Sequence, residues 1–382
     1  MMYNLDYSEE QLLIQKTARE FAREHLAPGV MERDRKMEFP AEQIKTLGEM
    51  GFMGMTVPEE WGGAGADVVS YALAIEEISR EDASAGVIMS VNNSLVCYVL
   101  DAFGTDEQKG KYLKKLATGE WLGAFSLSEP QAGSDASNLK TFAEKEDDHY
   151  LLKGTKNWVS SGINSDVVIV FAMTEKGAGH KGISAFIVEK SFDGFTTGKK
   201  EDKLGIRGSD TSELYFDNCP VPEVNRIGEE SSGFTIAMKA LDGGRTGVAA
   251  QAVGIARAAL EESVRYAKER KQFGSTIASF GAVKEKIAKM ATDISAARLL
   301  VHQAAYLKDN GKPFSTEAAM AKWFASKTAM ESATECVQIF GGYGYMEEYG
   351  VERLMRDAKI TQIYEGTSEI QQLVIARAML EE

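Results

Sequence analysis

The pattern of hydrophobic and polar positions changes twice along the chain. In the first third, apolar residues recur every three to four positions, as on the buried face of an α-helix. The first such helix begins at Ser8, where Ser8 and Gln11 have the spacing of a capping box, and it ends before Pro28. A helical region is therefore predicted over residues 1–121.

Between residues 122 and 228 the pattern becomes that of β-strands. Short runs rich in β-branched and aromatic residues alternate with Gly, Asp, Asn and Ser. The clearest strand candidates are 150–152, 167–172, 183–188 and 213–216. We expect an antiparallel barrel or sandwich here, with Pro220 and Pro222 closing the segment.

The last third, residues 229–382, is helical again. No proline lies between Pro222 and Pro313, and Ala, Leu, Glu, Lys and Arg dominate, as long helix interiors require. One apolar stripe repeats at alternating steps of four and three: Val283, Ile287, Met290, Ile294, Ala297, Val301 and Ala304. This stripe is typical of a bundle seam, and a structural role accounts for it. The order of the three regions predicts an α+β multidomain protein.

Composition and charge narrow the class of protein. The longest unbroken apolar run, residues 167–173, is far shorter than the about 18 residues that a membrane span needs, so we expect no span. The formal net charge of −14 disfavours nucleic acid or an anionic membrane as the main partner. Residues 1–15 lack the features of an export signal, and we expect a cytoplasmic protein. The scattered Cys and His residues predict neither a disulfide framework nor a metal site.

Four segments at the seams between these regions carry hydroxyl, glycine, aromatic and carboxylate groups that could form a ligand site. They are residues 125–135, 156–162, 338–345 and 363–370. Each also has an ordinary structural interpretation: a domain-joining turn, a core tryptophan, a tight turn and a solvated surface glutamate. Because the order of elements is unlike a doubly wound nucleotide-binding fold, loops between domains or subunits would have to hold any cofactor.

Taken together, in this order and at these spacings, the four segments resemble the acyl-CoA dehydrogenase family of flavoenzymes over essentially the whole chain. Its carboxyl-terminal signature is matched by Gln338, Gly341, Gly342, Gly344, Tyr345, Glu348, Arg353 and Asp357. Its amino-terminal signature is matched by Ser128-Glu129-Pro130 to Ser134-Asp135. Residues 88–95 and 198–209 are most similar to the short-chain, butyryl-CoA branch.

The resemblance implies a fold and an assembly. It implies an amino-terminal helical domain (1–121), a middle β domain (122–228) and a carboxyl-terminal four-helix bundle (229–382). It also implies a homotetramer built from two dimers.

The resemblance further implies an FAD site shared between two subunits. In one subunit the contacts would come from Phe125, Leu127, Ser128, Gly133, Ser134, Trp158, Val159 and Ser160, with Thr367, Ser368 and Glu369 near the phosphates. The neighbouring subunit would contribute Arg270, Phe273, Gln338, Ile339, Phe340, Gly341 and Gly342. Gly281 departs from the family pattern, which often has glutamine there, so the resemblance does not carry over that adenosine-side contact.

Glu365 resembles the family's catalytic base. In the implied reaction the α-proton leaves to a base while the β-hydrogen leaves as hydride to flavin N5 on the opposite face. The apolar and glycine neighbours of Glu365 are expected to limit solvation of the carboxylate and raise its pKa toward the working pH. Some relatives place the base beside the arginine that matches Arg245. Here that neighbour is Gly244, so Glu365 is the matched candidate.

The substrate contacts implied by the resemblance are Ser134, Asp242, Gly243, Gly244, Arg245 and Gly366. Arg245 would meet the polar end of CoA. A helix arginine paired with Asp242 is the alternative interpretation of that residue.

The expected function is FAD-dependent dehydrogenation of short-chain acyl-CoA thioesters to trans-2-enoyl-CoA in fatty acid β-oxidation, with electrons passed to an electron-transferring flavoprotein. Alternatives within the family are an oxidase, an isobutyryl- or 2-methylbutyryl-CoA dehydrogenase, and a glutaryl-CoA dehydrogenase. The glutaryl enzymes use an arginine near Gly86, which this chain lacks. A catalytically silent scaffold that binds FAD or acyl-CoA is a third possibility, against which Glu365 argues.

Overall fold

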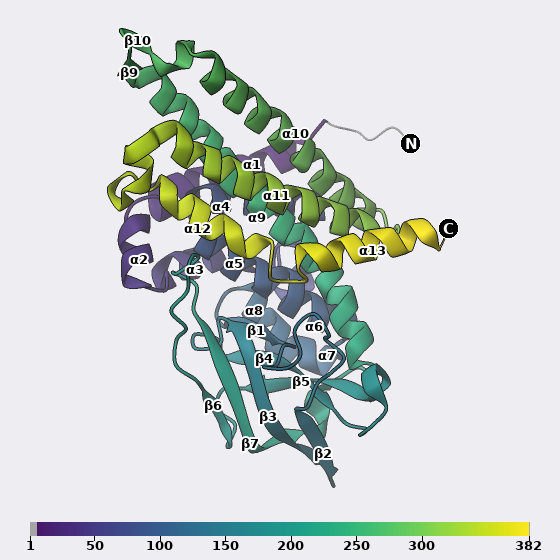
Figure 1. Cartoon of the computed structure of the whole chain (residues 1–382). Helices are drawn as coiled ribbons and strands as arrows, with labels where there is room; N and C mark the ends of the chain where they lie inside the picture. Colours follow the sequence, from purple (N-terminus) through teal and green to yellow (C-terminus); the bar gives the residue numbers. More distant parts are fainter. Residues whose placement is uncertain (1–5, 382) are drawn as a thin grey trace.

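The computed structural model describes residues 6–381 and has a helical, a β and a second helical region in chain order (Figure 1). Residues 1–5 and 382, which the predicted domain ranges include, lie outside the described residues. The α+β organisation and the three-domain fold expected from the sequence are confirmed.

The first helical region packs around α4 and α5, whose side chains are almost all buried. Its α-helices are α1 (Glu9–Phe21), α2 (Val30–Lys36), α3 (Ala41–Glu49), α4 (Val68–Glu81), α5 (Ala83–Ser90), α6 (Tyr98–Phe103), α7 (Asp106–Gln108) and α8 (Lys114–Ala117). The predicted capping box is present, because Ser8 Oγ accepts a hydrogen bond from the Gln11 backbone and Gln11 Oε1 accepts one from the Ser8 backbone. It fixes the start of α1.

One helical run in this region has the length and hydropathy to cross a membrane. It extends over Ala83–Phe103, and 94% of its apolar 18-residue stretch is buried inside the structure. The sequence pattern did not single it out, because Ser, Asn and Gly interrupt its apolar residues. Its burial is that of a central core helix.

The middle region is an eight-stranded mixed sheet. Its strands are β1 (Gly123–Ser126), β2 (Phe142–Glu146), β3 (His149–Ser160), β4 (Val167–Met173), β5 (Ile183–Glu189), β6 (Phe195–Thr197), β7 (Thr211–Pro222) and β8 (Arg226–Ile227). The spatial order is β6-β7-β3-β2-β4-β5-β8, with β1 beside β4. The sheet is mainly antiparallel, as expected, but β1 and β2 both pair with β4 in parallel. Alternation of side chains predicts a strand but not the direction of its neighbour.

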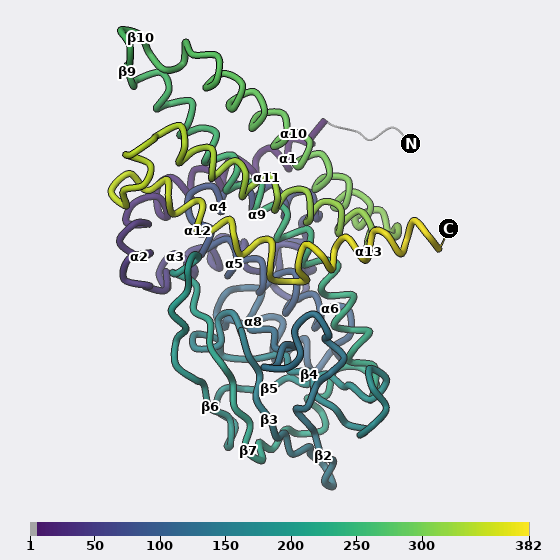
Figure 2. Tube along the Cα trace, in the orientation of Figure 1, coloured from purple at the N-terminus to yellow at the C-terminus, as the bar shows by residue number. Residues whose placement is uncertain are grey.

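The last region is dominated by three long helices. The elements are α9 (Gly233–Glu269), the β9–β10 hairpin (Lys271–Gln272 and Ser275–Thr276), α10 (Gly281–Asp309), α11 (Ser315–Phe340), α12 (Val351–Thr361) and α13 (Ser368–Leu380). Figure 2 follows α9 from the β region to the hairpin at the opposite end of the molecule. The predicted seam of α10 is buried from Met290 to Ala304, with Val283 and Ile287 half-buried.

The two helical regions share one continuous hydrophobic core. Helix α4 packs directly on α9, where a Cβ on Gly254 would lie 2.5 Å from the Glu76 carbonyl oxygen. Only glycine permits this close approach of the two backbones. The packing makes α9 a fixed frame along which functional side chains can be placed.

Candidate active site

Glu365 lies in the turn between α12 and α13 and faces α9. Its φ is +52°, a left-handed conformation that is uncommon for a residue with a side chain. Its Oε2 atom is buried and has no hydrogen-bond partner. A Cβ on Gly244 would lie 2.0 Å from Oε2, so the carboxylate has room only because residue 244 is glycine. A strained residue with an orphaned buried oxygen is typical of a functional site.

The electrostatic environment tunes this carboxylate. Burial raises the pKa of Glu365 to about 7, and the positive charges of Lys322 and Arg245 act in the opposite direction. A carboxylate with a pKa near neutrality accepts a proton efficiently at physiological pH.

Three side chains fix the turn around Glu365. Lys322 Nζ, on α11, donates to the Gly366 carbonyl at 2.6 Å. Gln371 Nε2, on α13, donates to the carbonyls of Glu365 at 3.2 Å and Gly366 at 2.9 Å. Tyr364 donates its hydroxyl hydrogen bond to Gln251 on α9. Lys322, Gln371 and Gln251 could not be predicted from the sequence, because nothing in a helical pattern marks a polar residue whose partner is on another helix or in a turn.

The remaining predicted substrate residues fall into two places. Asp242, Gly243 and Arg245 lie on α9 next to Gly244, and Arg245 Nη1 is 2.6 Å from Asp242 Oδ1. The ion pair that we considered as an alternative role for Arg245 is therefore present. Ser134 is instead exposed on the loop that follows β1.

A second group of predicted residues forms where the loop after β1 meets the end of β3. Lys156, fully buried, donates to the Leu127 carbonyl at 3.0 Å and to Glu129 Oε1 at 2.8 Å. The Asn157 backbone N–H donates to the Ser128 carbonyl at 2.9 Å. These bonds join the segments 125–135 and 156–162, which the sequence singled out separately.

Trp158 projects from this junction rather than into the core. Its side chain is 64% exposed, its φ is +59°, and the β3–β7 register shifts between Lys156 and Val159. The bulge turns the indole outward while Val159 remains buried. The core interpretation of Trp158 is wrong. The exposed indole, next in sequence to Asn157 and two residues before Ser160, is a suitable surface for a flat aromatic ligand.

Three other residues predicted to contact FAD lie on or after β1. Phe125 and Leu127 are mainly buried. Gly133 is exposed, and a Cβ on it would have open space around it. Thr367 caps α13 by accepting from the Ile370 backbone, and Ser368 and Glu369 form the first turn of that helix. Glu369 is exposed.

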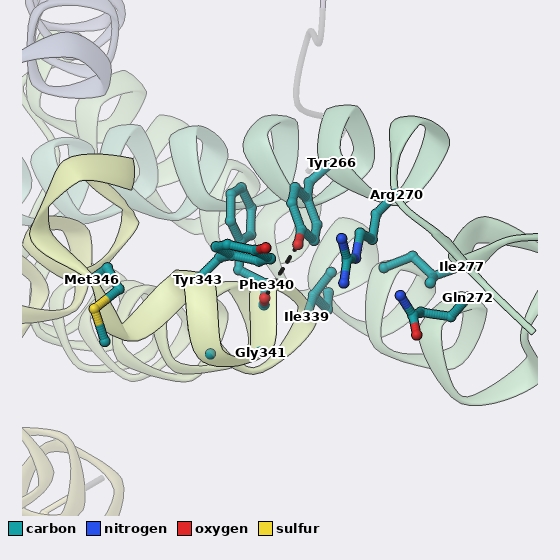
Figure 3. A pocket seen from close by; sticks show the side chains of 10 residues that line it. Tyr266, Arg270, Gln272, Ile277, Ile339, Phe340, Gly341, Tyr343 and Met346 are labelled. Atoms are coloured by element: carbon teal, nitrogen blue, oxygen red, sulfur yellow. Dashed lines mark hydrogen bonds between the residues drawn. The ribbon is translucent and has the colours of Figure 1, made fainter.

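A third group surrounds a cavity of about 420 Å³ at the end of the bundle (Figure 3). It is lined by Tyr266, Arg270, Gln272, Ile277, Ile339, Phe340, Gly341, Gly342, Tyr343 and Met346. Tyr266 stacks on Phe340 with ring centroids 4.0 Å apart, and the Arg270 guanidinium lies 5.2 Å from the Tyr343 ring centre. Phe273, on the adjoining hairpin, is 97% exposed, and Gln338 is exposed at the end of α11.

The second and third groups lie apart within one chain (Figure 1). The β9–β10 hairpin lies at the end of the molecule opposite the β-sheet (Figure 1). Its residue Gln272 lines the cavity, whereas Trp158 belongs to β3 of the sheet. No cluster of three or more His, Cys, Asp or Glu side chains suited to a metal ion occurs in residues 6–381.

Comparison with known proteins shows which family this chain belongs to. The profiles of the acyl-CoA dehydrogenase N-terminal, middle and C-terminal domains match residues 8–120, 124–219 and 231–380. The chain belongs to the acyl-CoA dehydrogenase family. It is an FAD-dependent oxidoreductase that acts on CH–CH donors.

Close relatives match this acyl-CoA dehydrogenase along its whole length. It is 54% identical to an acyl-CoA dehydrogenase of Bacillus subtilis, with 98% of each chain covered. It is 50% identical to the short-chain specific acyl-CoA dehydrogenase of Clostridium acetobutylicum, with 98% of this chain and 99% of the relative covered.

Two solved structures have nearly the same fold. Butyryl-CoA dehydrogenase from Megasphaera elsdenii superimposes with a TM-score of 0.97 at 50% identity, with full coverage of both chains. A chain in the structure described as an electron transferring flavoprotein of Acidaminococcus fermentans superimposes with a TM-score of 0.98 at 52% identity, again with full coverage.

The residues at the two loop groups fit FAD. The exposed indole of Trp158 offers a face for the flavin ring, and the Arg270 guanidinium offers a fork for diphosphate oxygens. A Cβ on Gly341, whose φ is +63°, or on Gly342 would meet no heavy atom of the described residues within 4 Å. A ligand can therefore approach the backbone of both residues closely.

Part of the family signature serves the fold. Asp357 Oδ1 accepts from the Ile206 backbone at 2.5 Å, and Asp357 Oδ2 accepts from Arg353 at 3.0 Å. A Cβ on Gly205 would lie 2.3 Å from the Arg356 carbonyl oxygen. Arg353 and Asp357 therefore dock the loop 198–209 of the β region on α12.

Replacing Lys156 with methionine should weaken flavin binding. The change leaves the buried Glu129 carboxylate without its cation, which costs about 3–5 kcal/mol and frees the loop from β3. The flavin-to-protein absorbance ratio after gel filtration measures the loss. Lys153→Met is the matched control, since Lys153 lies on the same strand but is exposed and paired with Glu144 at 3.2 Å. Equal flavin retention by both variants would contradict this role of Lys156.

Proposed function

We propose that this protein oxidises short-chain acyl-CoA thioesters to trans-2-enoyl-CoA, with Glu365 as the base that removes the α-proton. The observation that carries the proposal is the buried Oε2 of Glu365, which has no partner, lies against Gly244 and belongs to a carboxyl group with a pKa of about 7. The similarity to short-chain specific and butyryl-CoA dehydrogenases supports the substrate class.

The chain supplies a base and a hydrogen-bond donor for this chemistry. Bound FAD supplies the acceptor for the β-hydride at its N5 atom. The Glu365 carboxylate accepts the α-proton at a free oxygen. The Glu365 backbone N–H has no acceptor among the described residues, so it is available to the thioester carbonyl, where negative charge develops as the α-proton leaves.

Side chains from other helices that pack against α9 beyond Gly244 support a short acyl pocket. One turn beyond Gly244, a Cβ on Gly247 would lie 2.5 Å from the Tyr71 hydroxyl and 2.4 Å from Ser90 Oγ, which are themselves 2.9 Å apart. One turn further, Gln251 holds the Tyr364 hydroxyl. These polar pairs fill the space behind the carboxylate and leave little room for a long alkyl chain.

The FAD contacts are proposed as the sequence predicted them, divided between two subunits. The separation of the Arg270 group from Trp158 within one chain supports this division, because the two groups lie toward opposite ends of the molecule (Figure 1) and different subunits could bring them to one cofactor. The exposed Phe273 is suited to such a contact. We therefore propose a homotetramer of two dimers.

The same proposal covers domains, partner and location. We propose domains at 1–121, 122–228 and 229–382. An electron-transferring flavoprotein is the proposed electron acceptor, supported by the similar chain in the Acidaminococcus fermentans structure. The proposed place of action is the cytoplasm, which the acidic net charge of −14 suits.

Glu365→Gln should retain flavin and bind butyryl-CoA but lose turnover. Glutamine is nearly isosteric yet has no basic site near neutral pH, and general-base catalysis contributes about 10²–10⁴-fold. Anaerobic bleaching of the flavin band by butyryl-CoA measures the reaction. Wild-type rates in the variant would exclude Glu365 as the base. A wild-type protein that is bleached by neither butyryl-CoA nor the branched-chain or glutaryl-CoA thioesters would favour the silent scaffold.

Activity should peak at about four to six carbons along a series of straight-chain acyl-CoA substrates. Each methylene that fits gains about 0.8 kcal/mol, roughly fourfold in kcat/KM, whereas one that clashes with the Tyr71 and Tyr364 pairs costs about 1–3 kcal/mol. Measuring kcat/KM from four to sixteen carbons tests the pocket. A maximum at twelve carbons or beyond would refute the short-chain assignment and leave the role of Glu365 intact.

Arg270→Ala should release FAD and weaken assembly together, if the guanidinium reaches a cofactor held by the neighbouring subunit. Gel filtration with detection at the flavin band reports both properties. Arg265→Ala is the control, because Arg265 is on the same helix but is exposed and paired with Glu262 and Glu269. FAD binding as tight as in wild type would rule out this contact.

A further inference from the structure

Lys322 is a fully buried lysine next to Glu365 and is not among the site residues predicted from the sequence. It lies in the first third of α11 with no exposed surface. In the described part of the chain it forms no ion pair, and its ammonium donates to the Gly366 carbonyl at 2.6 Å. Burying an unpaired ammonium is costly, so its retention calls for an explanation.

Among the charged groups around Glu365 in residues 6–381, Lys322 is the cation that has no carboxylate bound to it. Glu365 is faced by Lys322 from α11 and by Arg245 from α9, and the hydroxyls of Tyr71 and Tyr364 also lie near it. Arg245 already has a carboxylate partner, Asp242, at 2.6 Å. Lys322 is faced by Glu365, Arg245 and, further along α13, Glu369.

The two carbonyl oxygens of the Glu365–Gly366 turn are both held. Lys322 and Gln371 bind the Gly366 carbonyl from two different helices, and Gln371 also reaches the Glu365 carbonyl. Glu365 is left-handed at φ +52° and Gly366 has φ +92°, so the turn needs such support to persist.

We propose that Lys322 is a positioning residue for proton abstraction, which holds the Glu365–Gly366 turn by its hydrogen bond and keeps the Glu365 carboxylate deprotonated by its charge. This rests on the proposed role of Glu365 as base. The ammonium does not bond the carboxylate itself, so both Glu365 oxygens remain available while the charge still acts on them.

The direction of the effect follows from the charges. Burial already raises the pKa of Glu365 to about 7, and a neighbouring positive charge lowers it. Removing the charge of Lys322 therefore raises the pKa of Glu365 further. A rise of about one unit would reduce the carboxylate fraction at pH 7 about fivefold.

Infrared difference spectroscopy of the FAD-loaded protein tests this without substrate. The C=O band of the protonated Glu365 carboxyl is identified by its loss in Glu365→Gln and is then titrated with pH. The test variants are Lys322→Gln, which keeps a hydrogen-bond donor without the charge, and Lys322→Arg, which keeps the charge. Lys327→Gln removes an exposed charge from the same helix as a control.

We expect the band midpoint to rise by about one pH unit in Lys322→Gln, and to stay near the wild-type value in Lys322→Arg and Lys327→Gln. An unchanged midpoint in Lys322→Gln would overturn the proposal. If Lys322→Gln does not fold, Lys322→Arg provides the test. This variant keeps the positive charge, so a rise of about one pH unit in the midpoint of its Glu365 band would contradict the proposal.

The proposed function stands or falls separately. If wild-type protein does not oxidise butyryl-CoA, the dehydrogenase proposal fails even when the Glu365 band titrates as expected. If wild type is active and the pH midpoint of the Glu365 band is the same in Lys322→Gln as in wild type, only the positioning role of Lys322 fails.

Discussion

The close approach of the Glu365 carboxylate to the backbone of α9 is the contact on which the site depends. A Cβ at residue 244 would lie 2.0 Å from Oε2, so glutamate at 365 requires glycine at 244. The contact also removes Oε2 from water, and this burial brings the pKa of Glu365 to about 7. One packing constraint thus sets both the place and the proton affinity of the proposed base.

The rest of the fold serves to hold one loop and one turn against rigid elements. Lys322 and Gln371 secure the Glu365 turn to α11 and α13, while the buried Lys156–Glu129 pair secures the loop after β1 to β3. In both places a buried lysine donates to a backbone carbonyl. The loop and the turn are thereby fixed to rigid elements, as catalytic geometry requires.

Much of the fold could be predicted from local sequence, whereas the site could not. The capping box at Ser8 and the α10 seam are encoded by neighbouring residues, and both are present. The parallel pairing of β1 with β4 was missed because alternation carries no information on strand direction. Glu365 was identified only through resemblance, and Lys322 was missed, since in sequence each resembles a surface residue of a helical protein.

The pH dependence of flavin reduction by butyryl-CoA tests the central claim most directly. If the buried Glu365 carboxylate is the base, kcat/KM measured by rapid anaerobic mixing should fall about tenfold per pH unit below about pH 7 and level off above it. A profile that stays flat from about pH 5.5 to about pH 8 would contradict the claim, because a base with this pKa would be largely protonated at the acid end.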